Sequence, residues 1–319
     1  AALGEAVIAD DTVTFFRAKI GHWLQPGRNH CGRLAVRDIG LVPDNMPEDA
    51  GQVAINSPLV WASKVPSLQV THKYARGRLW VLGGVWMTGA AALAAGAGLR
   101  AGAGLVGIAA TGIDSAEMYR HYERALLVAE AEEVSDWRAL LHRFRPDALV
   151  MGPGLANQPD PITWIKMGLE EVPQVVLDAD GLNAFQNNAE DLFAAIGPNM
   201  VLTPHEGEFD RLFGDLKGGR VERALAAAAR AGCTVVLKGN DTVIASAEGR
   251  CLINSNAPVS LATAGTGDVL AGTIGALMAR GMSGFDAASA GVWFHGRAAA
   301  AVGDALIADD LLDHLSTAV

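Results

Sequence analysis

From residue 79 onward, short runs of Leu, Val and Ile alternate with longer Ala-rich stretches. The short runs are typical of buried strands, and the Ala-rich stretches are typical of helices. The predicted strands are Leu79–Leu82, Leu105–Ala109, Ala148–Met151, Gln174–Asp178, Met200–Thr203, Thr234–Lys238 and Thr242–Ser246. The predicted helices are Thr88–Ala101, Ser115–His121, Ser135–Phe144, Pro161–Glu170, Glu208–Leu212, Val221–Ala231, Asp268–Arg280 and Phe285–Val302. This alternation predicts an α/β fold with a mostly parallel sheet that is covered by helices on both faces.

The chain before residue 79 has a weaker pattern. Two β-like pieces, Thr12–Phe16 and Arg33–Asp38, flank the turn-rich stretch QPGRNHCG. Residues 51–78 contain Pro58 and Pro66 and show little periodicity, which is typical of a linker or a wrapping segment.

Composition narrows the class of protein. Of the 319 residues, 50% are hydrophobic and 19% are charged, as in a compact globular protein. The net charge of −10 argues against general binding of nucleic acid or anionic membranes, because both need clustered Lys and Arg. The apolar run Met87–Val106 is interrupted by glycines and Arg100, so it is a poor membrane span. Three cysteines without a C-x-x-C pair favour reduced core residues and a cytoplasmic setting.

Polar and glycine-rich loops follow the predicted strands. They read GG at 83–84, GPG at 152–154, DADGLN at 178–183, PHEGE at 204–208 and KGNDT at 238–242. Ligands of parallel sheets bind at the carboxyl ends of the strands, so we expect these loops to form one site at one edge of the sheet.

The stretch AGTGD at 264–268 directly precedes a predicted helix. Backbone N–H groups of Gly265, Thr266 and Gly267 at a helix N-terminus, together with the helix dipole, favour an anion such as phosphate. Asp268 in the first turn is also consistent with a simple helix cap. If a phosphoryl group lies in the cradle, Asp268 is placed to take a proton from an attacking hydroxyl, and we expect the helix end to keep this carboxylate ionised.

Other motifs are weaker or absent. GAGLVG at 102–107 matches a dinucleotide fingerprint, but it closes a helix and enters a strand, which is the wrong order. The H-E-x-x-H zinc pattern fails because residue 209 is Phe. The KGNDT turn is either an ordinary hairpin or a nucleotide-binding turn with Lys238 near the phosphates. Asp178 and Asp180 are candidates for capping a helix or for holding Mg²⁺ through water. His295 has no evident partner and is interpreted as structural.

The order of the motifs resembles a known family. MTGAA with GLRAGAGLV, then MGPGL, VLDADGLNAF, LTPHEGEFDRL, VLKGNDTVIA and NAPVSLATAGTGDVLAG are similar to the ADP-dependent NAD(P)H-hydrate dehydratases of the ribokinase-like superfamily. The resemblance covers roughly residues 70–319 and implies a ribokinase-like three-layer αβα sandwich. The loop GGVWMTGA is one residue shorter than the family's usual loop and carries Trp86.

The resemblance also implies an activity and site residues. The S epimer of hydrated NADH or NADPH is phosphorylated by ADP, with ATP as a second candidate donor, and eliminates phosphate to give NAD(P)H and AMP. Asp268 matches the family's general base, and Gly265, Thr266 and Gly267 match its anion hole. The match to the nucleotide-binding segment consists of Lys238, Gly239, Asn240, Asp241, Thr242 and Gly267. Ala90, Gly154, His205 and Asp268 match positions that contact the hydrated dinucleotide. Mg²⁺ is expected with the nucleotide, and a homo-oligomer, a tetramer in particular, is expected for the assembly.

The N-terminal residues are similar to the last strands of the NAD(P)H-hydrate epimerase domain that many bacteria fuse ahead of the dehydratase. We therefore expect residues 1–50 to be an incomplete tail of that domain without epimerase activity, 51–70 to be a linker, and 71–319 to be the dehydratase domain. Two alternatives stay open. One is a small-molecule kinase of the same superfamily, such as a vitamin kinase, and the other is a nucleotide-binding subunit without turnover.

Overall fold

The computed structural model describes residues 4–42, 53–69 and 72–319. Its main body is a ten-stranded sheet in the order β3-β12-β11-β10-β9-β8-β7-β4-β5-β6. The strands are β3 Val53–Ile55, β4 Arg78–Gly83, β5 Leu105–Ala110, β6 Leu127–Glu130, β7 Ala148–Met151, β8 Val175–Leu177, β9 Val201–Leu202, β10 Thr234–Leu237, β11 Val243–Ala245 and β12 Cys251–Ile253. Neighbouring strands pair in parallel except where β11 pairs with β10 and β12. The predicted mostly parallel sheet is confirmed.

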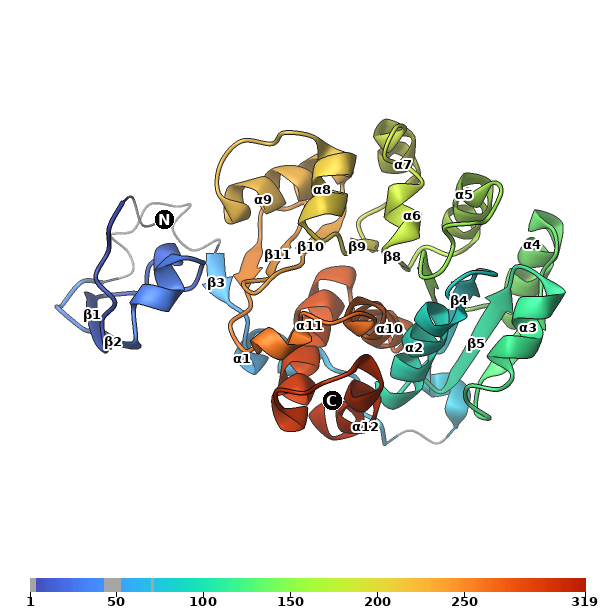
Figure 1. The fold of residues 1–319 in the computed structure, drawn as a ribbon, viewed down its shortest axis with the longest axis horizontal. Helices are drawn as coiled ribbons and strands as arrows, with labels where there is room; N and C mark the ends of the chain where they lie inside the picture. The colour runs from blue at the N-terminus through green and yellow to red at the C-terminus, as the bar shows by residue number, and fades with distance from the viewer. Residues whose placement is uncertain (1–3, 43–52, 70–71) are drawn as a thin grey trace.

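Helices cover both faces of this sheet (Figure 1). One layer contains α2 Thr88–Arg100, α3 Ile113–Tyr119, α10 Thr266–Ala279, α11 Gly284–Val302 and α12 Ala308–Ala318. The other contains α4 Val134–Phe144, α5 Pro161–Glu171, α6 Asp180–Asn183, α7 Ala189–Ala195, α8 Glu206–Phe213 and α9 Arg220–Ala231. Each layer has its own buried apolar cluster against the sheet, so the architecture is the expected three-layer αβα sandwich. No helix in the described ranges has both the length and the apolar character to cross a membrane.

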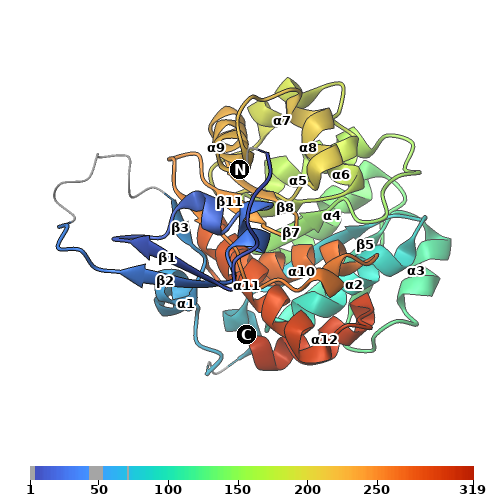
Figure 2. The ribbon, with the colours of Figure 1, turned by 60° about the vertical axis from the view of Figure 1, so that its left-hand side comes forward.

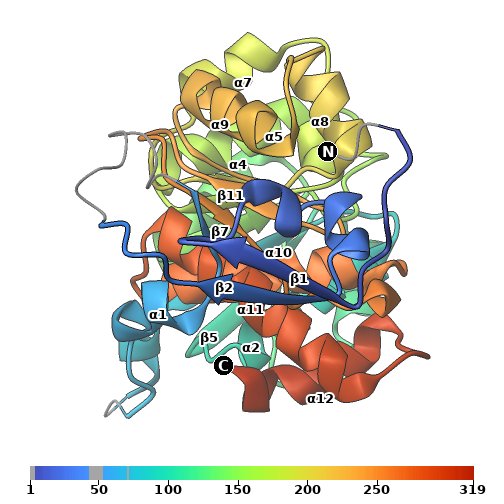
Figure 3. The same ribbon diagram turned by 90° about the vertical axis from the view of Figure 1, so that its left-hand side faces the viewer.

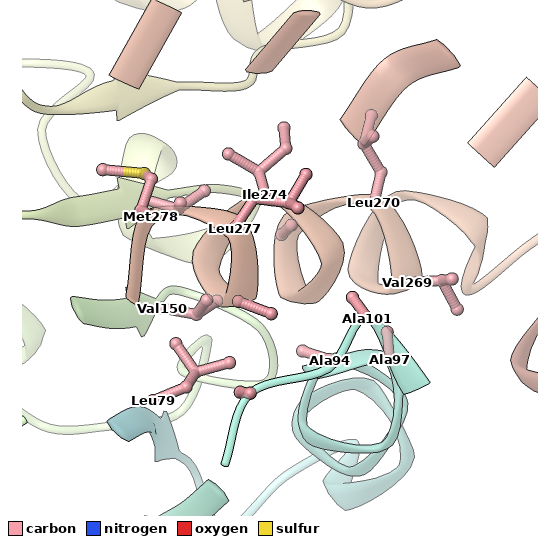
Figure 4. Packing of buried hydrophobic residues seen from close by; sticks show 14 of the residues in the cluster. Leu79, Ala94, Ala97, Ala101, Val150, Val269, Leu270, Ile274, Leu277 and Met278 are labelled. Carbon is pink, nitrogen blue, oxygen red and sulfur yellow. The ribbon is translucent and has the colours of Figure 1, made fainter. Parts of the chain in front are cut away.

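The middle of the first layer is α10, which is buried around almost its entire circumference. Figure 4 shows the strand residues Leu79 and Val150, and the residues Ala94, Ala97 and Ala101 of α2 and its C-terminal end, along one side of α10. Helix α2 can approach closely because Ala94 and Ala97 present little bulk to α10. A helix that is apolar on all sides is typical of the interior of a large domain. The start of α10 is therefore rigidly held at the carboxyl edge of the sheet.

The N-terminal segment forms a small unit of its own (Figure 2). Strands β1 Asp11–Phe15 and β2 Arg33–Arg37 pair in parallel as a two-stranded sheet, and the short helices η1 Ile20–His22 and η2 Gly27–His30 lie between them in the chain. The two predicted β-like pieces are thus confirmed as strands.

Within the predicted linker 51–70, the described residues 53–69 are more ordered than their weak periodicity indicates. Residues 53–55 form the edge strand β3 on β12, and α1 Pro58–Trp61 buries Trp61 against Trp293 and Phe294. Strands as short as β3, β6 and β12, with three or four residues each, hold too few positions to show periodicity, and all three escaped prediction. Residues 1–3, 43–52 and 70–71 lie outside the described residues, so the boundaries of the predicted tail, linker and dehydratase domain stay predictions.

The close approach of α10 and α2 gives a test of the core. A methyl group on Gly272 would collide with the backbone carbonyl oxygen of Ala94, so Gly272→Ala forces the two helices apart. We expect the free energy of unfolding to fall by about 1–3 kcal/mol in urea denaturation. Gly89→Ala in α2 is the matched control, because nothing lies closer than 3.9 Å to its new methyl group. Equal stability of the two variants would contradict the tight crossing.

Candidate active site

The candidate site begins at the N-terminus of α10. Gly265 precedes the helix with φ of 87°, a left-handed conformation that favours glycine. The hydroxyl of Thr266 donates to the carbonyl oxygens of Leu261 (2.9 Å) and Thr263 (3.0 Å), which fixes the loop that enters the helix. The first backbone N–H groups of a helix have no acceptor within it, so this end of α10 can bind an anion.

The KGNDT turn lies beside this helix end. It joins β10 to the antiparallel β11, which confirms the two predicted strands on either side of the turn. The Thr242 hydroxyl closes the turn by donating to the Gly239 carbonyl oxygen at 2.8 Å. An ideal Cβ atom on Gly267 would lie 3.5 Å from Lys238 Nζ, so the helix N-terminus and the lysine face each other.

A cleft of about 380 Å³ opens between these elements. Its lining includes the predicted site residues His205, Lys238, Gly239, Asn240, Thr242, Thr266 and Gly267. The rest of the lining consists of Ala257, Pro258, Leu261, Ala262, Thr263, Leu270, Val292 and His295. The structure therefore brings together most of the residues that the sequence analysis predicts to bind an anion and a nucleotide.

The remaining predicted residues lie outside the lining, in different surroundings. Asp268 directly follows the lining residue Gly267. Ala90 lies in the first turn of α2, the helix that packs on α10. Gly154 has φ of 78°, and a Cβ atom there would lie 2.7 Å from the Trp86 carbonyl oxygen, so the loops after β4 and β7 touch. Asp241 is 3% exposed, and its carboxylate bonds to groups outside the cleft.

Lys238 is not a free cation in this structure. Its Nζ donates to Asp178 Oδ1 at 2.6 Å and lies 3.8 Å from Glu208 Oε2. Burial lowers the pKa of Lys238, but the Asp178 and Glu208 carboxylates outweigh burial and hold the pKa above its usual value. The lysine is thus charged and joins the ends of β8, α8 and β10.

Two further acidic residues complete the group of carboxylates. Glu208 is 5% exposed and caps α8 by accepting the His205 backbone N–H at 2.8 Å. Asp180 accepts the Ala156 backbone N–H at 3.1 Å, and burial raises its pKa. Asp178 therefore pairs with Lys238, and Asp180 binds the loop after β7.

The expectation that the helix end keeps Asp268 fully ionised is wrong. Burial raises the pKa of Asp268 to about 7, Asp178 adds to this rise, and Lys238 opposes it. Loss of hydration and like charge exceed the effect of one helix terminus, which is worth only about 0.3–1 kcal/mol at an exposed site. A carboxylate with a pKa near 7 is suited to general base catalysis at neutral pH.

His295 was interpreted as structural, and the structure places it in the cleft wall. Burial lowers its pKa to about 4, so the imidazole is neutral. Its Nε2 atom is buried and has no hydrogen-bond partner among the described residues. A lone histidine in an Ala-rich helix gives no sequence signal for this position, because only the packing of α11 against the cleft defines it.

Arg220 is a residue of this region that the sequence did not single out. Its Nη2 donates to the carbonyl oxygens of Leu237 (3.1 Å) and Lys238 (3.0 Å), and its Nη1 pairs with Glu206. The arginine therefore holds the base of the KGNDT turn from the α9 side.

Comparison with known proteins places this site in a family. The profile described as NAD(P)H-hydrate dehydratase matches residues 79–319. The bifunctional NAD(P)H-hydrate repair enzyme Nnr of Salinibacter ruber is 35% identical, over 98% of this chain and 62% of that enzyme. The ADP-dependent (S)-NAD(P)H-hydrate dehydratase of Neisseria meningitidis is 45% identical, over 39% of this chain and 44% of that enzyme. This chain thus spans less than two thirds of the length of the bifunctional relatives.

Solved structures agree with the fold. The Bacillus subtilis ADP/ATP-dependent NAD(P)H-hydrate dehydratase, co-crystallised with ATP and Mg²⁺, matches with a TM-score of 0.64 at 27% identity, over 78% of this chain and 91% of that one. A ribokinase-like superfamily protein of Enterococcus faecalis matches with a TM-score of 0.72 at 21% identity, over 84% and 95%. The predicted ribokinase-like fold is confirmed.

The ion pair of Lys238 with Asp178 predicts a large effect on stability. Lys238→Met leaves the Asp178 carboxylate, whose side chain is 2% exposed, without its cation. We expect the free energy of unfolding to fall by about 3 kcal/mol in urea denaturation. Lys166→Met is the matched control, because Lys166 and Asp191 form an exposed pair worth less than about 1 kcal/mol. The double variant Lys238→Met with Asp178→Leu should recover part of the loss, and a mild effect of Lys238→Met alone would contradict this role.

Proposed function

The chain belongs to the NAD(P)H-hydrate dehydratase family, and we propose that it dehydrates the S epimer of hydrated NADH or NADPH to NAD(P)H with ADP as phosphoryl donor. The products in this proposal are NAD(P)H, AMP and phosphate. The observation that carries the proposal is one shared cleft. The N-terminus of α10 and Lys238 line it together, and Asp268 stands directly beside it.

The cleft supports a position for the nucleotide. We propose that the phosphates lie at the backbone N–H groups of Thr266 and Gly267, next to the Lys238 ammonium group. The nucleoside then lies along the wall that includes Pro258, Val292 and His295. Gly239, Asn240 and Thr242 line the same cleft and are proposed to contact the nucleotide.

The hydrated dinucleotide is proposed to bind on the other side of Asp268. His205 reaches the cleft from the cap of α8, and Gly154 touches the loop that precedes α2 and Ala90. In the first step, Asp268 takes the proton of the ring hydroxyl. The oxygen of that hydroxyl attacks the terminal phosphorus of ADP, and AMP leaves. The ring C–O bond of this phosphate ester then breaks and a proton leaves the neighbouring ring carbon, so that phosphate is released and the ring double bond of reduced nicotinamide forms.

Mg²⁺ is proposed to arrive with the nucleotide. Among the described residues there is no group of three or more His, Cys, Asp or Glu side chains placed to hold a metal ion. Mg²⁺ in phosphoryl-transfer sites commonly uses one or two carboxylates together with phosphate oxygens. Asp178 and Glu208, both beside Lys238, offer donors of this kind. The ion would neutralise charge on the transferring phosphoryl group.

The assembly and the cellular setting stay predictions. A homo-oligomer, with a tetramer as the specific expectation, rests on the family resemblance. A cytoplasmic location rests on three cysteines that all carry free thiols in the structure.

The activity is tested by supplying hydrated NADH with ADP or ATP and Mg²⁺ and recording the absorbance of reduced nicotinamide. We expect absorbance to return together with free phosphate. Asp268→Asn should lower kcat by a factor of about 10² to 10⁴ while calorimetry shows nucleotide binding retained. Asp114→Asn is the matched control, because Asp114 is an exposed acid in the first turn of α3.

The alternatives give different outcomes in the same assay. A small-molecule kinase would leave a stable phosphorylated product without restored absorbance. A nucleotide-binding subunit would bind ADP and release nothing. Full activity of Asp268→Asn would overturn the assignment of the base.

The pKa of Asp268 predicts the pH dependence of the reaction. A base must be ionised, and burial raises the pKa of Asp268 to about 7, so kcat/KM should rise with pH through about 7 and level off above about pH 8. Below that pKa we expect a loss of about tenfold per pH unit. The Asp180 carboxylate contributes to the raised pKa of Asp268, so Asp180→Asn should move the acidic limb of the kcat/KM profile to lower pH. A limb that stays in place or moves upward would contradict the electrostatic cause.

A further inference from the structure

The short helices of the N-terminal segment lie against the hairpin end of the main sheet. Figure 3 shows this segment in front of β11, and Figure 2 shows the same neighbourhood from another side. Trp23 and Leu24, between η1 and η2, pack against the apolar cluster that contains β10 and β11. The segment is therefore seated on the main body, next to the KGNDT turn.

Two polar contacts connect this segment to the two walls of the cleft. The backbone N–H of Gln25 donates to Asp241 Oδ2 at 2.8 Å, and Asp241 belongs to the KGNDT turn. Arg28 Nη2 donates to the Ser255 carbonyl oxygen at 2.8 Å, and Ser255 lies two residues before the lining residue Ala257. The same short segment thus contacts the KGNDT turn and the loop that leads into Ala257, both of which border the cleft.

Asp241 transmits the first contact to the turn. Its side chain is 5% exposed, and its Oδ1 lies 3.2 Å from Arg220 Nε. Arg220 in turn donates to the carbonyl oxygens of Leu237 and Lys238. One carboxylate oxygen of Asp241 thus accepts a hydrogen bond and the other lies in an ion pair. A buried carboxylate with such partners is held in place, because movement would leave its charge uncompensated.

We propose that Trp23, Leu24, Gln25 and Arg28 form a brace that positions the nucleotide-binding turn, and that Asp241 is a positioning residue which links the brace to Lys238. Asp241 then acts through the turn and does not touch the nucleotide. This inference rests on the proposed function for its effect on nucleotide binding. Its structural part concerns only the order of the turn and stands independently of the reaction.

The experiment uses Arg28→Ala and Asp241→Asn in the full chain. For each variant, the dissociation constant of ADP is measured by calorimetry, KM and kcat are measured in the absorbance assay, and hydrogen exchange is measured for the amides of residues 238–242. We expect ADP to bind about three- to tenfold more weakly, as for loss of one hydrogen bond. For Arg28→Ala, the KM of hydrated NADH and kcat should stay unchanged, and in both variants the turn amides should exchange faster.

Two controls separate positioning from general damage. Arg33→Ala removes an exposed arginine of the same segment whose one ion pair among the described residues is with Asp11, and it should behave like the parent protein. Arg28→Lys keeps one donor for the Ser255 carbonyl oxygen and should restore most of the affinity for ADP.

The outcomes are distinct. Unchanged ADP affinity and unchanged exchange in both Arg28→Ala and Asp241→Asn would overturn the brace. An equal effect of Arg33→Ala would also overturn it, as would a fall in kcat together with a rise in the KM of both ADP and hydrated NADH. These results would indicate general destabilisation. If the parent protein failed to bind ADP, the proposed function would fall, while the exchange of residues 238–242 would still test the brace.

Discussion

One largely buried cation, Lys238, connects the elements that border the cleft. Its ammonium group bonds to Asp178 at the end of β8, lies near Glu208 in α8, and faces Gly267 at the start of α10. A charge removed from water needs such partners, since burial without them costs several kcal/mol. The same pair fixes the β10–β11 turn relative to the sheet edge, so the geometry of the phosphate cradle depends on it.

Rigidity in the apolar core supports this arrangement. Helix α10 packs against α2, α11 and the strands β4, β7 and β8, and its N-terminus is the part that reaches the cleft. A catalytic carboxylate on a rigid helix end keeps its position when substrates bind. His205 and Asn240, which line the cleft from the loops after β9 and β10, are exposed. The catalytic carboxylate and these binding groups thus come from different parts of the fold.

Asp268 shows how the environment decides a chemical role. At the end of a helix in water it would be an ordinary ionised cap. In this structure burial and the Asp178, Asp180 and Glu208 carboxylates raise its pKa to about 7 against the opposing effect of Lys238. The result is a base whose proton affinity is suited to neutral pH, in place of a permanent anion.

The sequence alone determined the long elements and the chemistry of the cradle. Strands such as 148–151 and helices such as 161–171 have strong local patterns, and the amide donors of AGTGD belong to the backbone, so both could be predicted from neighbouring residues. The tertiary structure alone decided the edge strand β3, the pairing of Lys238 with Asp178 sixty residues away, the seating of Gln25 on Asp241, and the pKa of Asp268. Each of these depends on distances between segments that are far apart in the chain, and burial and Coulomb energy are set by those distances in space and not by separation along the sequence.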